Sequence, residues 1–194
     1  MSQHTECHIF LQDPCCTGKN PGDFRREALI VDLSFNLRQF SVAVAHIHEL
    51  IDFTVAIFVV RDSKVLLIHH RNLDKWLPLG GHIELHEDPE QAALREAKEE
   101  SGFDIELLGE RPPTTSDGTR ALITPRFLDI HRITDAHQHI GMIYWARPKR
   151  GTLSLAAAEH HDIRWCSSNE LDSLTPPMSD AVKWYCRKAL EEVT

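Results

Sequence analysis

Hydrophobic side chains recur at three- and four-residue steps in the first third of the chain, which is the spacing of one face of an amphipathic helix. The residues of this face are Leu33, Leu37, Phe40, Val44, Ile47 and Ile51. Residues 1–30 show no such periodicity and contain two prolines and two glycines, so we expect a loop or weakly ordered segment there. The pattern therefore predicts one N-terminal helix preceded by irregular chain.

Beyond Asp52 the pattern changes to runs of β-branched and aromatic residues, which favour strands. The segments F-T-V-A-I-F-V-V-R and K-V-L-L-I-H-H-R are separated only by D-S, which predicts a β-hairpin. A loop and the segment W-L-P-L-G-G-H-I-E follow. Further strands are predicted at D-I-E-L-L-G, R-F-L-D-I-H-R-I, H-I-G-M-I-Y-W-A-R and D-I-R-W-C.

A helix with clear boundaries interrupts these strands. Asp88 is a suitable N-cap, Pro89 suits the first helical position and Gln91 completes a capping box. Gly102 is the natural residue just past the C-terminus. With a last amphipathic helix ending near Glu191, the order of elements predicts an α/β (α+β) fold in which a mixed β-sheet is sandwiched between helices.

Charge and composition narrow the functional classes. The formal net charge of −8 provides no general electrostatic footprint for nucleic acid or an anionic membrane. No apolar run is long enough to span a bilayer, and no secretory signal is visible. Five cysteines without a regular framework indicate free thiols in the cytoplasm. His4, Cys7, His8, Cys15 and Cys16 fit no standard zinc spacing, so unstructured chain explains them as well as a metal cluster.

Three glutamates crowd the central helix. Glu96, Glu99 and Glu100 fall within an arc of roughly 100°. A solvated acidic face is one interpretation. The alternative is a site for Mg²⁺ or Mn²⁺, because a glycine pair just before the helix allows a backbone carbonyl to approach, and Arg95 can hold a carboxylate in place.

The same segment resembles a known family. Residues 81–103, G-H-I-E-L-H-E-D-P-E-Q-A-A-L-R-E-A-K-E-E-S-G-F, match the Nudix box at every fixed position: Gly81, Glu87, Arg95, Glu96, Glu99, Glu100 and Gly102. Ala97 fills an apolar slot with a smaller side chain than usual. The resemblance implies a Nudix domain over residues 51–194, after an N-terminal extension over residues 1–50 that carries one amphipathic helix.

The resemblance also implies roles for these residues. Glu96, Glu99 and Glu100 would bind Mg²⁺, or Mn²⁺, with the carbonyl of Gly81 as a further ligand. Arg95 would orient the glutamates, supported structurally by Glu87. The general base would be a glutamate of the cluster or a residue of a later loop. There we choose Glu159 from the candidates Glu159, His160, His161 and Asp162, against the simpler view of an ordinary surface loop.

Substrate contacts rest on weaker signals. Arg71 is expected to meet a phosphate, Trp76 to stack on a base or cover the core, and His82 to touch phosphate or point to solvent. His137 and His139 alternate along a strand, so both would line one wall. Metal binding through histidines is open, although the glutamates already supply a site.

The implied activity is hydrolysis of the diphosphate linkage of a nucleoside diphosphate derivative, such as ADP-ribose or a nucleotide sugar, or of a nucleoside triphosphate. No proline or tyrosine after the box selects one substrate. The partner is thus a small molecule, and the protein is a monomer or homodimer. Two alternatives stay open: a non-catalytic nucleotide-binding or regulatory module, and an isoprenyl-diphosphate isomerase, for which Cys166 is the remote candidate for the catalytic cysteine.

Overall fold

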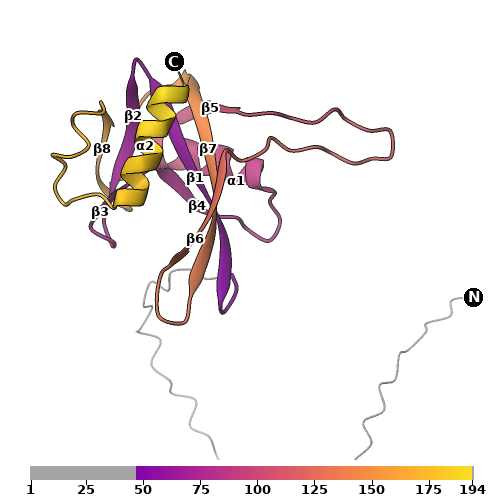
Figure 1. Ribbon diagram of the computed structural model, residues 1–194, viewed down its shortest axis with the longest axis horizontal. Coiled ribbons are helices and arrows are strands. Elements are labelled where there is room, and N and C mark those ends of the chain that lie inside the picture. Colours follow the sequence, from indigo (N-terminus) through magenta and orange to yellow (C-terminus); the bar gives the residue numbers. More distant parts are fainter. Residues whose placement is uncertain (1–46, 194) are drawn as a thin grey trace, which may run out of the picture. The chain divides into compact units, whose positions relative to one another are not determined.

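Eight strands and two helices lie within residues 47–193, the part of the chain described by a computed structural model (Figure 1). No helix in this part has the length and apolar content needed to cross a membrane. The elements are β1 (Ile51–Arg61), β2 (Lys64–His70), β3 (Lys75–Leu77), β4 (Leu79–His82), α1 (Pro89–Ser101), β5 (Phe103–Leu108), β6 (Phe127–Arg132), β7 (Gln138–Gly151), β8 (His160–Cys166) and α2 (Asp180–Glu192).

Strand β1 is the centre of the sheet. It runs parallel to β7, with Ile51 opposite Gln138, and antiparallel to β4, with Thr54 opposite His82. Its last two residues pair with β2, which continues to β3 and β8. Strands β5 and β6 pair with different parts of β7. One long strand therefore fixes where β4 lies relative to the rest of the sheet.

The predicted hairpin is confirmed at the β1–β2 turn. Arg61 pairs with Lys64, so only Asp62 and Ser63 form the loop. Both have positive φ angles, 51° and 56°. A two-residue turn with this geometry matches the right-handed twist of the strands it joins.

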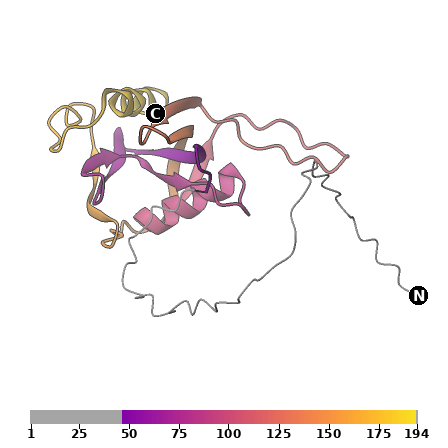
Figure 2. The ribbon, with the colours of Figure 1, turned by 90° about the horizontal axis from the view of Figure 1, so that it is seen from below.

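The two helices cover opposite faces of the sheet, as Figure 2 shows. Alternate residues of β1 point to opposite sides. Val55, Ile57 and Val59 pack in one core cluster with three alanines of α1, at positions 92, 93 and 97. Phe58 and Val60 pack in the other, with Cys186 and Ala189 of α2. The predicted mixed sheet between helices is therefore confirmed, and its faces can be named the α1 face and the α2 face.

Helix α1 begins and ends where the sequence predicts. The Asp88 side chain accepts hydrogen bonds from the N–H groups of Glu90 (2.9 Å) and Gln91 (3.1 Å), and the Gln91 side chain accepts one from the N–H of Asp88 (3.0 Å). At the other end, Gly102 has a φ of 76° and its N–H donates to Lys98 O. These caps fix which residues of α1 face the sheet.

The N-terminal prediction can be followed only at its end. Residues 33–46 of the predicted helix, and the cysteines at positions 7, 15 and 16, lie outside the described residues. Ile47 lies in a bend and Ile51 belongs to β1, so the last two positions of the predicted helical face are wrong. The Asp52 carboxylate accepts hydrogen bonds from the N–H groups of Ile47 and His48, which stabilises a bend before the strand. The boundary at residue 51 between extension and domain stays a prediction.

Candidate active site

Two neighbouring glycines of β4 contact carboxylates of α1. The N–H of Gly80 donates a hydrogen bond to Glu100 Oε2 (2.7 Å). A Cβ added to Gly81 would lie 2.3 Å from Glu96 Oε1, so the missing side chain lets this carboxylate rest against the strand. Glu99 keeps 59% of its side chain exposed. Two of the three glutamates are therefore held between helix and strand, and the third is open to solvent.

Arg95 ties the cluster together. Its Nε and Nη2 donate to the two carboxylate oxygens of Glu87, at 2.7 and 2.9 Å. Its Nη1 donates to Glu96 Oε1 (2.8 Å) and Glu99 Oε2 (3.1 Å), and Nη2 also reaches the carbonyl of His82 (3.1 Å). A guanidinium group bound on both edges has little freedom to rotate, so it restricts the rotamers of the glutamates it contacts.

The cluster nevertheless lacks positive charge. Burial, together with the charges of Glu100 and Glu99, raises the pKa of Glu96 to about 7 despite the hydrogen bond from Arg95. Burial also raises the pKa of Glu100, against the opposing effect of His160 and the Gly80 N–H. One arginine does not offset three carboxylates here, so the site favours an additional cation or proton.

The oxygen atoms present suit a hard divalent cation. Glu96 lies against Gly81, Glu100 accepts a hydrogen bond from Gly80, and Glu99 shares Arg95 Nη1 with Glu96. Carboxylate and carbonyl oxygens are the ligands that Mg²⁺ and Mn²⁺ prefer. The close approach of Glu96 to Gly81 places the two groups where one ion can contact both. The donor set therefore fits the metal that the sequence predicts.

The raised pKa of Glu96 predicts a pH effect on the metal-free protein. Since the folded state holds this proton up to about pH 7 and the unfolded state releases it near its ordinary pKa of 4.5, the free energy of unfolding falls as the pH rises between these values. The contribution is at most about 3 kcal/mol. Urea unfolding of wild type and Glu96→Gln at about pH 5 and pH 8 measures it as the difference between their pH slopes. Equal slopes would contradict the prediction.

A second element reaches the glutamates from the start of β8. His160 is fully buried, and its Nε2 lies 3.0 Å from Glu100 Oε1. Together with the N–H of Gly80, it contacts both oxygens of that carboxylate. Glu100 is therefore held from the strand on one side and from β8 on the other.

This contact of His160 could not be read from the alternation of β8. His70 pairs with His160 and His69 with Asp162, so His161 is an extra residue in the ladder. A bulge of this kind moves the residue beyond it to the other face of the sheet. The sequence suggested His160 only as one of several candidates for the base, because nothing in the pattern announces the bulge.

Arg71 fixes the loop that precedes β8. Its backbone N–H donates to the carbonyl of Glu159 (2.8 Å), and its Nη2 donates to the carbonyls of Ala157 (2.9 Å) and His160 (3.2 Å). The Glu159 side chain is exposed, and its negative charge contributes to the raised pKa of Glu100. The loop thus brings a solvent-facing carboxylate into the electrostatic range of the cluster.

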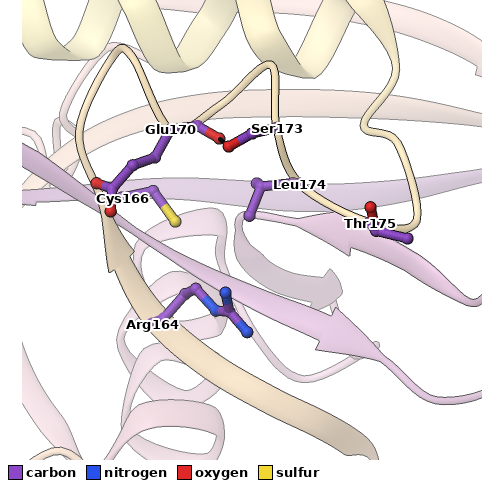
Figure 3. A pocket seen from close by; sticks show the side chains of 6 residues that line it. All are labelled: Arg164, Cys166, Glu170, Ser173, Leu174 and Thr175. Carbon is purple, nitrogen blue, oxygen red and sulfur yellow. Dashed lines mark hydrogen bonds between the residues drawn. The ribbon is translucent and has the colours of Figure 1, made fainter.

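Trp76 and Cys166 lie away from the glutamates, in the core cluster that packs under α2. Trp76 is 2% exposed and donates a hydrogen bond to the carbonyl of Thr175, so its ring covers the core rather than a base. Burial raises the pKa of Cys166 to about 11, which keeps the thiol protonated. Figure 3 shows it in a separate pocket, whose lining residues are Arg164, Cys166, Glu170, Ser173, Leu174 and Thr175.

His82 also turns away from the glutamates. Gly81 faces α1, and successive residues of a strand point to opposite sides, so the His82 side chain belongs to the α2 face. Its Nε2 lies 3.4 Å from Asp52 Oδ2, and its ring centroid is 4.8 Å from that of His139. Only its carbonyl, bound by Arg95, takes part in the cluster around the glutamates.

The chain is similar to a known domain family and to several solved structures. The model of the NUDIX domain matches residues 51–185. A NUDIX family hydrolase from Clostridium perfringens is 32% identical over 74% of this chain and 98% of its own, with a TM-score of 0.64. A MutT NUDIX hydrolase from Burkholderia pseudomallei (23% identical, 74% and 98% covered, TM-score 0.53) and a MutT protein from Methanosarcina mazei (14%, 77% and 99%, 0.57) share the fold. None of the curated proteins compared with the chain matches it.

Proposed function

We propose, because the chain belongs to the Nudix hydrolase family, that it uses a divalent metal ion to cleave the diphosphate linkage of a nucleoside diphosphate derivative. Membership of the family makes the protein a hydrolase of phosphoric anhydride bonds. The metal dependence and the substrate class are our proposal. Within that class, ADP-ribose, a nucleotide sugar and a nucleoside triphosphate are the candidates.

One observation carries the metal dependence: buried Glu100 and half-buried Glu96, both with raised pKa values, lie against a glycine pair, and Glu99 shares the guanidinium group that holds Glu96. We assign Mg²⁺, or Mn²⁺, to the carboxylates of Glu96, Glu99 and Glu100 and to the carbonyl of Gly81. The bound ion would neutralise the diphosphate and lower the pKa of an attacking water. The assignment also accounts for the like charges that the helix carries.

The remaining roles follow from the contacts of each side chain. Arg95 and Glu87 hold the glutamates in one arrangement, and His160 holds Glu100. Glu159 is our choice for the general base, because its carboxylate is exposed to solvent and acts electrostatically on Glu100. It would accept a proton from the attacking water.

The residues suggested for substrate contacts change their roles in this proposal. Arg71 becomes a positioning residue, since its guanidinium group donates to carbonyls of the loop that carries Glu159. Trp76 and His82 are left out of the substrate site, because the first ring is buried in the core and the second faces Asp52. The side chains that recognise the nucleoside are not assigned.

The geometry does not favour the two alternative functions. An isomerase needs a cysteine near the glutamates, whereas Cys166 lies in the core under α2. A module that only binds nucleotides does not require a buried carboxylate such as Glu100, contacted on both oxygens and costly to desolvate. A measurement of turnover distinguishes a hydrolase from a module that only binds nucleotides.

A substrate panel tests the proposed function. The panel contains ADP-ribose, nucleotide sugars, NADH, dinucleoside polyphosphates and nucleoside triphosphates, each with Mg²⁺ or Mn²⁺, and products are identified by chromatography. We expect cleavage at a diphosphate linkage that stops when a chelator removes the metal. Binding without turnover of any compound would favour the regulatory module instead, and turnover that persists in the chelator would exclude the metal.

A further inference from the structure

A second group of metal-ligating side chains lies at the start of β1. Asp52, His137 and His139 are all buried, and one potential ligand atom from each lies within 4.8 Å of the others. Asp52 and His139 are direct partners in the parallel pairing of β1 and β7. Two of the three side chains are therefore held by the central strand pair of the fold, and His137 lies directly before β7.

This group occupies the α2 face of the sheet, whereas the glutamates occupy the α1 face. Val55 and Ile57 of β1 pack under α1, so Asp52, at the other parity, points away from it. Ile143 and Trp145 of β7 pack under α2, which gives His139 the same side, and the contact between His137 Nε2 and Asp52 places His137 there as well. A ligand of this group is thus separate from the metal proposed for hydrolysis.

The distances suit an ion held by nitrogen and oxygen atoms. Asp52 Oδ2 lies 3.3 Å from His137 Nε2 and 3.4 Å from His82 Nε2. Tetrahedral zinc with bonds of about 2.0–2.1 Å has ligand atoms about 3.3–3.4 Å apart. The ring of His139 adjoins both histidines, with centroids 4.8 Å from His82 and 5.2 Å from His137. One ion can therefore lie between Asp52, His137 and His139, and His82 is close enough to Asp52 to join them as a fourth ligand after a side-chain rotation.

Backbone contacts orient two of these ligands. His137 Nδ1 lies 3.1 Å from the carbonyl of Glu49, and because a carbonyl only accepts, Nδ1 must carry the proton. The Nε2 atom is then directed at Asp52. The Asp52 carboxylate itself accepts N–H groups of His48 (2.6 Å) and Ile47 (3.2 Å). Such outer contacts, with a carbonyl behind the imidazole, are typical of histidines that bind metal.

We propose that Asp52, His137 and His139, with His82 as the fourth ligand, bind a transition-metal ion of the zinc class. Imidazole nitrogens select such ions over Mg²⁺. The ion would join β1, β4 and β7. Since His82 directly follows Gly81, it would also hold the end of the strand that the glutamates contact. The proposal does not rest on the proposed hydrolytic function.

Binding of Co²⁺, whose visible absorption reports tetrahedral coordination, tests the site. The full chain is used with Cys7, Cys15 and Cys16 replaced by serine, and excess Mg²⁺ occupies the glutamates. We expect one equivalent of Co²⁺, displaced by Zn²⁺, and a rise of the unfolding temperature with Zn²⁺. His137→Gln combined with His139→Gln should weaken binding at least about a hundredfold. His131→Gln is the matched control, since His131 is an exposed neighbour of His139 that bonds to Asp129.

Three results would overturn the proposal. The first is Co²⁺ affinity unchanged in the double variant, and the second is a wild-type chain that binds no Co²⁺ under these conditions. The group would then be a network of histidine–aspartate ion pairs. Circular dichroism shows whether the double variant folds; if it does not, the isosteric Asp52→Asn replaces it, with the same loss of Co²⁺ affinity expected. Loss of binding in His131→Gln to the same degree would also count against the assignment.

Discussion

Glu99→Gln and Glu100→Gln are each expected to lower turnover of the substrate found in the panel by at least about a hundredfold. Each change removes one negative oxygen donor from the proposed metal site and keeps the size of the side chain. Glutamine at position 100 can still accept the hydrogen bond from Gly80, and position 99 is largely exposed, so both variants should fold. Steady-state kinetics at saturating Mg²⁺ give the result.

Glu106→Gln is the matched control for these variants. Glu106 is exposed on β5. Its replacement by glutamine removes the same charge from the chain and leaves the glutamates of α1 unchanged. Its turnover should equal that of the wild type. Urea unfolding midpoints show whether all three variants retain the fold. Wild-type rates in both Glu99→Gln and Glu100→Gln would remove the carboxylates from the mechanism.

Alanine substitutions at the two adjacent glycines of β4 are expected to have different effects, the first on the stability of the fold and the second on the metal site. A Cβ on Gly80 would lie 2.1 Å from the carbonyl oxygen of Val55, in the strand that pairs with β4, and its φ of 147° disfavours any side chain. Gly80→Ala should therefore destabilise the fold by roughly 3 kcal/mol or more. Its turnover would fall because less protein is folded.

Gly81→Ala should instead impair the site and spare the fold. There the added Cβ meets the Glu96 carboxylate, which is the end of a flexible side chain and can move aside. We expect the affinity for Mn²⁺ to fall at least about tenfold while the unfolding midpoint stays close to that of the wild type. Titration of Mn²⁺ and urea unfolding of both alanine variants check the pair. The same loss of stability in both would show that Gly81 serves only the strand.

Local signals made part of the fold predictable. The limits of α1 follow from Asp88 and Gly102, whose roles depend on neighbouring backbone atoms alone. The β1–β2 hairpin follows from two strand-like runs separated by two residues. The segment that carries the glutamates could be located for the same reason, because β4, the turn after it and α1 follow one another in the chain and hold most of its contacts.

Features that depend on distant pairing could not be predicted. The burial of Trp76 requires the loop of Thr175, and the contact of His160 with Glu100 requires a bulge opposite β2. The side on which His82 lies was open in the sequence, because the strand is short and its partner was unknown. His137 and His139 were expected to share one wall, but Asp52 joins them only through the parallel pairing of β1 and β7.

The hydrogen bonds of Arg71 to the loop before β8 affect how the sequence of the enzyme can change in evolution. All three of its hydrogen bonds to this loop and to the first residue of β8 end on main-chain carbonyls, at positions 157, 159 and 160. Because every amino acid supplies that atom, the exposed positions 157 and 159 can be exchanged without releasing the loop. Selection can therefore vary the chemistry offered at this edge of the site while the path of the chain stays the same.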